Sequence, residues 1–261
     1  MAGPGNFEEG LNKMYNQGLY EESSTIKHRL GTIRYTSDGR RFVYTKATAA
    51  AIASGIAVGK PNAPQNCTVA AADAAINLAG VRKITLTLSG TPTANLYQDG
   101  YMIITAGTGI GEMYRIRGNS VDDSPASGRC TFYLYDALKA TMVASSTTVD
   151  VYVNPYSGVY INPTVADGTA TTGFKIAGVT QRGVTASYYF WLQTDGLATA
   201  LVETSTSGAE GDERYLIPAA STAGYLRSVT AAYAIGIAVG ELVEMTDQTN
   251  GEATLVCLKC S

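Results

Sequence analysis

The amino-acid sequence predicts an all-β fold: a β-barrel or β-sandwich body with an extended N-terminal arm and minor short helices. Short segments of alternating apolar and polar residues recur along the chain, separated by Gly, Pro, Asn, Asp and Ser, as in successive strands and turns. Only two Ala-rich segments, 45–59 and 66–80, could each hold a short helix, because glycines cut them off. The first 30 residues have few large apolar side chains, so they are expected to bury no core of their own.

The first strands are expected in residues 32–47, TIRYTSDGRRFVYTKA. Two β-prone runs are separated there by Ser37, Asp38 and Gly39, a composition that favours positive φ and predicts a β-hairpin. The segments KITLTLSG and TTVDVYVNP follow, and each alternates as a strand with one buried face does. Further strands are expected at 129–137, 172–179, 187–196, 199–205 and 252–260.

The segment YMIITAGTGIGEMYRIRGN, residues 101–119, leads a strand-like run into Gly107, Gly109 and Gly111, as a strand enters a phosphate loop. A dinucleotide fingerprint needs GxGxxG before a helix, whereas the spacing here is GxGxG and a second alternating run follows. The segment therefore predicts a hairpin of strands 101–105 and 112–117, joined by glycines with positive φ, and no cofactor site.

Three parts are expected along the chain: the arm at 1–30, a β-rich domain at 31–160, and a second β-rich part at 161–261 that packs with the first. The pentapeptide GIAVG occurs at 55–59 and again at 235–239. It indicates either two similar β-turn-β segments of small residues, or two chain ends that are neighbours in one barrel with the central stretch inserted between them.

Composition and charge argue against several classes of function. A formal charge of -3 makes nucleic acid an unexpected main partner. The N-terminus lacks the pattern of a secretory signal and no apolar run reaches the length of a membrane span, so synthesis in the cytoplasm and no membrane partner are expected. The four cysteines are expected to be free thiols, and the CxxC of Cys257 and Cys260 has no second ligand pair for a metal.

No catalytic, cofactor-binding or metal-binding residues are predicted, and no enzyme activity is expected. His28 is the single histidine and is interpreted as an exposed or interface residue. Glu210, Asp212 and Glu213 form an acidic cluster that is interpreted as solvated, although a catalytic pair of carboxylates can also form from residues distant in sequence.

Two sets of residues are candidates for contacts with other proteins. Seventeen tyrosines favour surfaces that are partly buried and partly wet. In YYFW (188–191), Tyr188 and Phe190 are expected on one face of a strand and Tyr189 and Trp191 on the other, either inside a sandwich or at a subunit contact. The strongest charge asymmetry forms either a solvated face or a docking surface for an acidic partner, and it comprises Lys27, Arg29, Arg34, Arg40, Arg41 and Lys46.

Four segments together resemble bacteriophage virion proteins of the head decoration, or cement, type. They are KHRLGTIRYTSDGRRFVYTKA, NLYQDGYMIITAGTGIGEMYRIRGN, DVYVNPYSGVYINP and VTASYYFWLQTDGLATALV, and the resemblance covers most of residues 27–245. It implies a β-rich protein on the capsid exterior, assembled in the host cytoplasm, that bridges capsomers through a terminal arm. Residues 65–160 are extra in comparison with small decoration proteins.

The resemblance implies two partners, the major capsid protein and the chain itself as a homo-oligomer, a dimer or trimer. Residues 1–46 would clamp onto the major capsid protein, and Tyr188, Tyr189 and Trp191 would lie at the oligomer interface. The alternative is a tail or head-fibre protein that binds host-surface glycan. The capsid-interface candidates are Lys27, Arg29, Arg34, Arg40 and Arg41.

Overall fold

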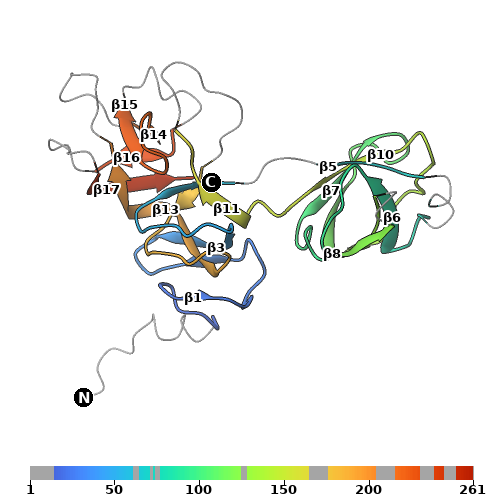
Figure 1. The fold of residues 1–261 in the computed structure, drawn as a ribbon, viewed down its shortest axis with the longest axis horizontal. Coiled ribbons are helices and arrows are strands. Elements are labelled where there is room, and N and C mark those ends of the chain that lie inside the picture. The colour runs from blue at the N-terminus through green and yellow to red at the C-terminus, as the bar shows by residue number, and fades with distance from the viewer. Residues whose placement is uncertain are drawn as a thin grey trace. The chain divides into compact units, whose positions relative to one another are not determined.

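The structure is a computed structural model, which describes residues 15–60, 65–70, 73, 77–124, 128–164, 176–203, 215–229, 238–243 and 251–260. It confirms the all-β fold. The chain forms two compact units, one of residues 1–61 with 156–261 and one of residues 62–155. We call them the sheet unit and the barrel unit (Figure 1).

This division differs from the predicted parts at 31–160 and 161–261. The chain enters the barrel unit after Pro61 and leaves it after Pro155, so the barrel is inserted into the sheet unit. The reason is strand pairing: within the described residues, the barrel strands pair among themselves, whereas strands from both ends of the chain pair with each other. The central stretch is inserted, as one reading of the GIAVG repeat expected, while residues 235–237 of the second copy lie outside the described ranges.

The sheet unit contains one 11-stranded sheet in the order β15-β14-β16-β17-β13-β12-β4-β11-β3-β2, with β1 on β13. Its strands are β1 (Glu22–Ser23), β2 (Ile33–Tyr35), β3 (Arg41–Ala47), β4 (Ala57–Gly59), β11 (Ser157–Ile161), β12 (Ile176–Val179), β13 (Tyr189–Val202), β14 (Tyr215–Pro218), β15 (Leu226–Val229), β16 (Gly240–Leu242) and β17 (Glu252–Lys259).

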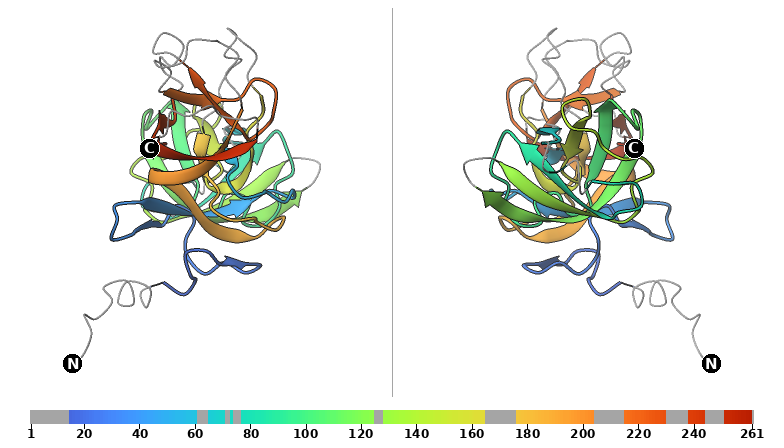
Figure 2. Two further views of the ribbon diagram at one scale, coloured as in Figure 1. Left: turned by 90° about the vertical axis from the view of Figure 1, so that its left-hand side faces the viewer. Right: turned by 90° about the vertical axis from the view of Figure 1, so that its right-hand side faces the viewer.

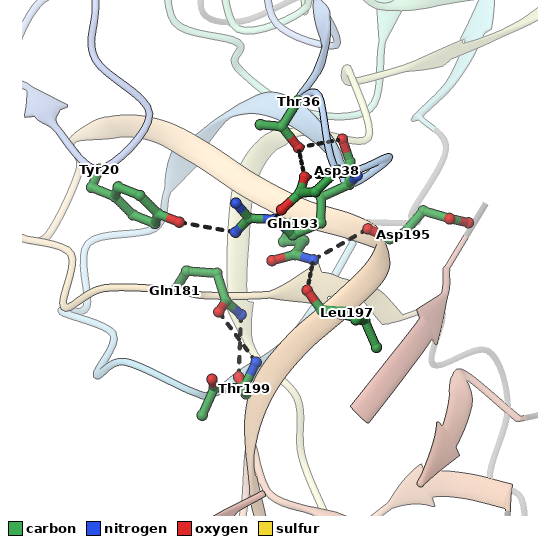
Figure 3. A network of polar contacts seen from close by, with 9 residues as sticks. Tyr20, Thr36, Asp38, Gln181, Gln193, Asp195, Leu197 and Thr199 are labelled. Atoms are coloured by element: carbon green, nitrogen blue, oxygen red, sulfur yellow. Dashed lines mark hydrogen bonds and ion pairs between the residues drawn. The ribbon is translucent and has the colours of Figure 1, made fainter. Parts of the chain in front are cut away.

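The central strand β13 is one strand of 14 residues, where the sequence predicted two, at 187–196 and 199–205. It pairs antiparallel with β3 from Tyr189 to Asp195 and with β17 from Asp195 to Val202, and is the long orange strand of Figure 2. A register shift between Gln193 and Asp195 marks the change of partner. The Gln193 side chain lies at this bend, where its amide donates to the carbonyls of Asp195 (3.2 Å) and Leu197 (2.7 Å) (Figure 3).

Both faces of β13 are covered, as the alternation of residues 188–191 predicted. Phe190 packs in an apolar cluster with Tyr188 at its margin. Trp191 packs in a different cluster, with Tyr189 at its margin. The predicted hairpin is also confirmed, because β2 pairs antiparallel with β3 and Gly39 has φ 85°.

The Ala-rich segment 45–59 forms no helix, contrary to the expectation. Its backbone groups bond to other parts of the sheet unit instead: the amide of Ala47 donates to the carbonyl of Tyr188 (2.9 Å), and Ile52 forms a β-bridge with Val184. Helix propensity is a weak preference that such long-range pairing overrides. In the second segment, 66–80, a strand covers the start and Asp73 is helical, while 71–72 and 74–76 lie outside the described residues.

The barrel unit is a closed barrel in the order β10-β5-β6-β9-β8-β7, filled by a single apolar cluster that includes Leu86, Ile104, Ile116, Phe132 and Val149. All pairings among its described strands are antiparallel. The strands are β5 (Gln65–Thr68), β6 (Lys83–Leu88), β7 (Tyr101–Ala106), β8 (Met113–Ser124), β9 (Arg129–Leu134) and β10 (Thr148–Tyr152).

The glycine-rich segment is the hairpin connection that the sequence predicted. Strands β7 and β8 pair antiparallel on either side of it, and Gly107, Gly109 and Gly111 have φ of 83°, 84° and 85°. Gly107 has a further role, because a Cβ there would collide with the carbonyl oxygen of Ser146 on a neighbouring segment. Gly111 has open space around it.

We expect Gly107→Ala to destabilise the barrel unit more than Gly111→Ala. Both variants place an alanine at positive φ, which costs about 1–2 kcal/mol. Only Gly107→Ala adds a backbone collision, which costs a further ~1–3 kcal/mol because the segment around Ser146 must shift. Urea unfolding of both full-length variants, followed by circular dichroism, measures the difference; equal losses of stability would contradict the packing role of Gly107.

Candidate functional site

Residues 15–30 lie against strands β2, β3 and β13 of the sheet unit, and we call them the docked arm. The sequence predicted an arm of residues 1–30 that buries no core of its own, and the buried residues of the docked arm pack against side chains of the sheet. Gln17 is only 3% exposed and Leu30 7%, while Tyr15 and Leu19 pack at the margin of the cluster around Trp191. The arm is therefore held by a few anchoring side chains.

The Gln17 side chain bridges the arm and the sheet. Its Nε2 donates to the carbonyl of Glu21 within the arm (2.9 Å) and to the carbonyl of Tyr189 on β13 (3.0 Å). Its Oε1 accepts a hydrogen bond from the hydroxyl of Tyr44 on β3 (2.8 Å). The nitrogen and the oxygen of the buried amide therefore both have hydrogen-bond partners, which offsets the cost of burying this side chain.

The backbone carbonyl of Gln17 is equally engaged. It accepts from Nη1 of Arg34 on β2 (3.2 Å) and from the indole N–H of Trp191 on β13 (3.3 Å). One residue of the arm thus contacts three strands of the sheet. This role could not be predicted from the sequence, because a single glutamine in a polar segment resembles any solvated residue.

A second anchor lies farther along the arm, at β1. Glu22 of β1 pairs with Phe190 on β13 in antiparallel register. The Glu22 carboxylate accepts from the backbone amide of Thr185 (2.7 Å) and from its hydroxyl (3.0 Å), and lies 3.5 Å from the Arg182 guanidinium. The ladder has only two residue pairs, so side chains supply most of the specific contacts of the docked arm.

An aromatic cluster lies between the arm and the sheet. The His28 ring meets the rings of Tyr15, Tyr44 and Trp191 at centroid distances of 5.7, 5.1 and 5.3 Å. Tyr15 and Trp191 also meet edge to face at 5.2 Å. The Arg34 guanidinium lies over the Tyr15 ring (4.7 Å) and the Trp191 ring (5.5 Å), so the cluster already holds one cation.

His28, which was interpreted as an exposed or interface residue, is half-buried at the contact between the arm and the sheet. Its Nε2 atom is buried and has no hydrogen-bond partner among the described residues. Burial lowers the pKa of His28 below its ordinary value, and the positive charge of Arg34 lowers this pKa further. The ring is therefore neutral at neutral pH.

The five predicted basic residues do not form one exposed surface. Arg34 is 4% exposed and engaged with Gln17, so it is excluded from a free docking face. Arg40 binds Asp38 (2.7 Å) and the hydroxyl of Tyr20 in the arm (2.9 Å), and Arg41 donates to the hydroxyl of Thr194 (3.1 Å). The remaining two, Lys27 and Arg29, are exposed.

The predicted aromatic interface residues are engaged within the chain. Trp191 is 2% exposed beneath the docked arm. Tyr189 is half-buried and accepts the Gln17 amide at its carbonyl, and its ring stacks on Tyr44 at 6.0 Å. Tyr188 is half-buried against the cluster on the opposite face of β13. Exposed apolar side chains occur instead on the β7–β8 hairpin of the barrel unit, where Ile110 is 68% and Met113 62% exposed.

The structure describes no group of three or more His, Cys, Asp or Glu side chains that could hold a metal. All four cysteines are free, and burial raises the pKa of the Cys67 and Cys260 thiols to about 12, which keeps them protonated and unreactive. The acidic cluster at Glu210, Asp212 and Glu213 lies outside the described residues. Within the described part of the chain, no helix has the length and apolar character to cross a membrane.

Comparisons of the chain with protein-family models, with curated proteins and with solved structures found no match.

We expect Gln17→Ala to release the docked arm locally. The change removes three hydrogen bonds at about 1 kcal/mol each, so docking should weaken by ~2–4 kcal/mol. Hydrogen exchange at the amides of Lys27 and Thr185, which are bonded to Tyr44 and Glu22 across the contact, measures this directly.

Gln181→Ala is the matched control. Gln181 exchanges two hydrogen bonds with the backbone of Thr199 on β13 in an exposed setting, and neither bond involves the arm (Figure 3). Its loss should change stability by less than about 1 kcal/mol and leave the protection of Lys27 and Thr185 unchanged. Unaltered protection in Gln17→Ala would show that Gln17 does not anchor the arm.

Proposed function

We propose that the protein is a structural virion protein that binds the outer surface of a phage capsid and stabilises it by bridging capsomers. The resemblance of the four segments supports this, and so does the all-β body with a terminal arm. The observation that carries the proposal is the anchoring of the docked arm through Gln17 on three strands of the sheet. The docked arm is fixed to the sheet from Tyr15 onward. The 14 residues before Tyr15 contain few large apolar side chains, a composition suited to ordering on a partner.

The partner in this proposal is the major capsid protein. The exposed pair Lys27 and Arg29 follows the arm anchors and supplies the positive charge for an acidic patch on the shell. Many such contacts around a closed shell add up through multivalency, so each of them needs only modest affinity. Stabilisation of a shell in this way requires no catalysis, and we propose no enzyme activity.

In this proposal the protein is made in the host cytoplasm and assembles with itself, as a dimer or trimer, on the capsid exterior. Because Trp191 is covered by the docked arm, it does not offer a free contact surface. The exposed apolar pair Ile110 and Met113 on the barrel unit is the better candidate for a protein contact.

The second candidate function is a tail or head-fibre protein that binds host-surface glycan. One observation favours it: the outer face of the barrel unit carries a row of half-buried side chains in neighbouring register, Tyr152 on β10, Tyr101 on β7 and Arg115 on β8. Tyr135 completes the row, and the Arg115 guanidinium lies 5.3 Å from the centre of its ring. Tyrosine rings beside a cation are suited to stacking on sugars and binding their polar groups.

Charge reversal of the exposed basic pair tests the first proposal. Lys27→Glu with Arg29→Glu should weaken binding to capsids stripped of this protein at least tenfold, because attraction to the acidic shell becomes repulsion. Co-sedimentation with the capsids measures it. The matched control is Arg82→Glu with Lys83→Glu, two consecutive exposed basic residues of the barrel unit.

Equal binding by both double variants and the wild type would remove Lys27 and Arg29 from the capsid contact. Absence of wild-type binding to stripped capsids would refute the decoration function itself. Binding to host-envelope glycan that Tyr101→Ala abolishes would then establish the second candidate.

A further inference from the structure

The contact between the docked arm and the sheet includes a histidine among its aromatic rings. His28 is the only histidine of the chain, and its ring is enclosed by Tyr15 from the arm, Tyr44 from β3 and Trp191 from β13. Its Nε2 atom is buried and meets no hydrogen-bond partner in the described part of the chain. This is an arrangement that accepts a neutral imidazole and provides nothing for the second proton of an imidazolium.

We propose that His28 is an acid-sensitive latch, whose protonation releases the docked arm from β3 and β13.

The charges around His28 oppose its protonation. Arg34 of β2 faces the cluster with its guanidinium over the Tyr15 and Trp191 rings. Lys27 and Arg29 flank the histidine in the arm, and both are cations. The groups that face the ring from β3 and β13 are Tyr44, whose pKa burial raises, and Trp191, whose indole carries no charge. None of these groups carries a negative charge.

Aromatic rings attract cations, and this effect works in the opposite direction. Two of the three rings around His28 already carry the Arg34 guanidinium, at 4.7 Å and 5.5 Å. A second cation in the same cluster gains less from these rings and is repelled by the first. Burial of the unpartnered Nε2–H adds its desolvation cost, so the neutral form is favoured while the arm is docked.

Docking of the arm is favoured at higher pH. Burial, and then Arg34, lower the pKa of His28 in the docked arm below the ordinary value of about 6.5 that a released arm would have. The released state therefore binds the proton more readily. Docking is at full strength above pH 6.5 and weakens progressively as the pH falls toward the docked pKa.

A hydrogen-bonded path connects the histidine to the anchor. The Tyr44 hydroxyl accepts from the backbone amide of Lys27, next to His28 (3.0 Å), and donates to Oε1 of Gln17 (2.8 Å). Displacement of His28 thus breaks a bond on the same hydroxyl that holds Gln17. When the arm is released, the indole N–H of Trp191 and the carbonyl of Tyr189 lose their hydrogen-bond partners in the arm. Another extended segment can bind these two groups.

The chain provides its own probes for the experiment, because it has one histidine and one tryptophan. The full-length protein is titrated from pH 7.5 to 5.0. The imidazole resonances by NMR report the pKa of His28, Trp191 fluorescence reports cover by the arm, and exchange protection factors at Lys27 and Thr185 report docking. We expect a pKa below 6.5, a red-shifted emission at low pH, and protection that falls at least tenfold.

Three variants isolate the histidine. His28→Phe keeps an aromatic ring without a titrating group, and His28→Gln is a neutral alternative if the phenylalanine does not fit; each should stay docked at pH 5.0. His28→Lys carries a permanent charge and should be undocked already at pH 7.5. Circular dichroism confirms that the sheet unit remains folded in each.

The proposal is overturned if His28 titrates at or above 6.5, or if the wild-type arm keeps its protection at pH 5.0. It is equally overturned if both neutral variants lose protection with the pH dependence of the wild type, since another group would then be responsible. None of these readouts involves a capsid, so the latch stands or falls independently of the proposed function.

Discussion

The backbone pairing of β13 is the constraint on which the rest of the structure depends. A buried strand must satisfy its N–H and C=O groups along both edges. Over its 14 residues, β13 does so with strands from the start of the chain, β1 and β3, and from its end, β15 and β17. The sheet can therefore form only when residues 1–61 pair with residues 156–261, and the segment between them folds as a separate barrel.

The same strand provides the site. Alternation along residues 188–191 presents Trp191 and Tyr189 on one face, and the docked arm covers them. Because the β1 ladder is only two residue pairs long, the arm depends on Gln17, Glu22 and the aromatic cluster rather than on continuous pairing. Such a contact has a small free energy, so the loss or protonation of a single group can decide whether it holds. The sheet beneath it is held by long ladders and stays folded.

Much of the fold could be read from local pattern, and the failures have physical causes. Alternation located the strands around Ile84, Val149 and Val256, and the glycines at 107, 109 and 111 identified a hairpin through their positive φ. Short strands such as β4, β14 and β16 were missed because three or four residues carry no measurable period. The Ala-rich segment at 45–59 was assigned a possible helix because its partners, Val184 and Tyr188, are more than a hundred residues away.

By itself, the sequence determined the all-β class, the hairpin turns and the two-faced burial of residues 188–191, since each follows from the preferences of neighbouring residues. Only the tertiary structure decided that the barrel is inserted, that Arg34 and Trp191 are covered rather than exposed, and that Gln17 and His28 occupy the arm contact. These depend on residues far apart in the chain meeting in space. A lone glutamine or histidine has no periodicity, and its role appears only when the donors, acceptors and charges around it are known.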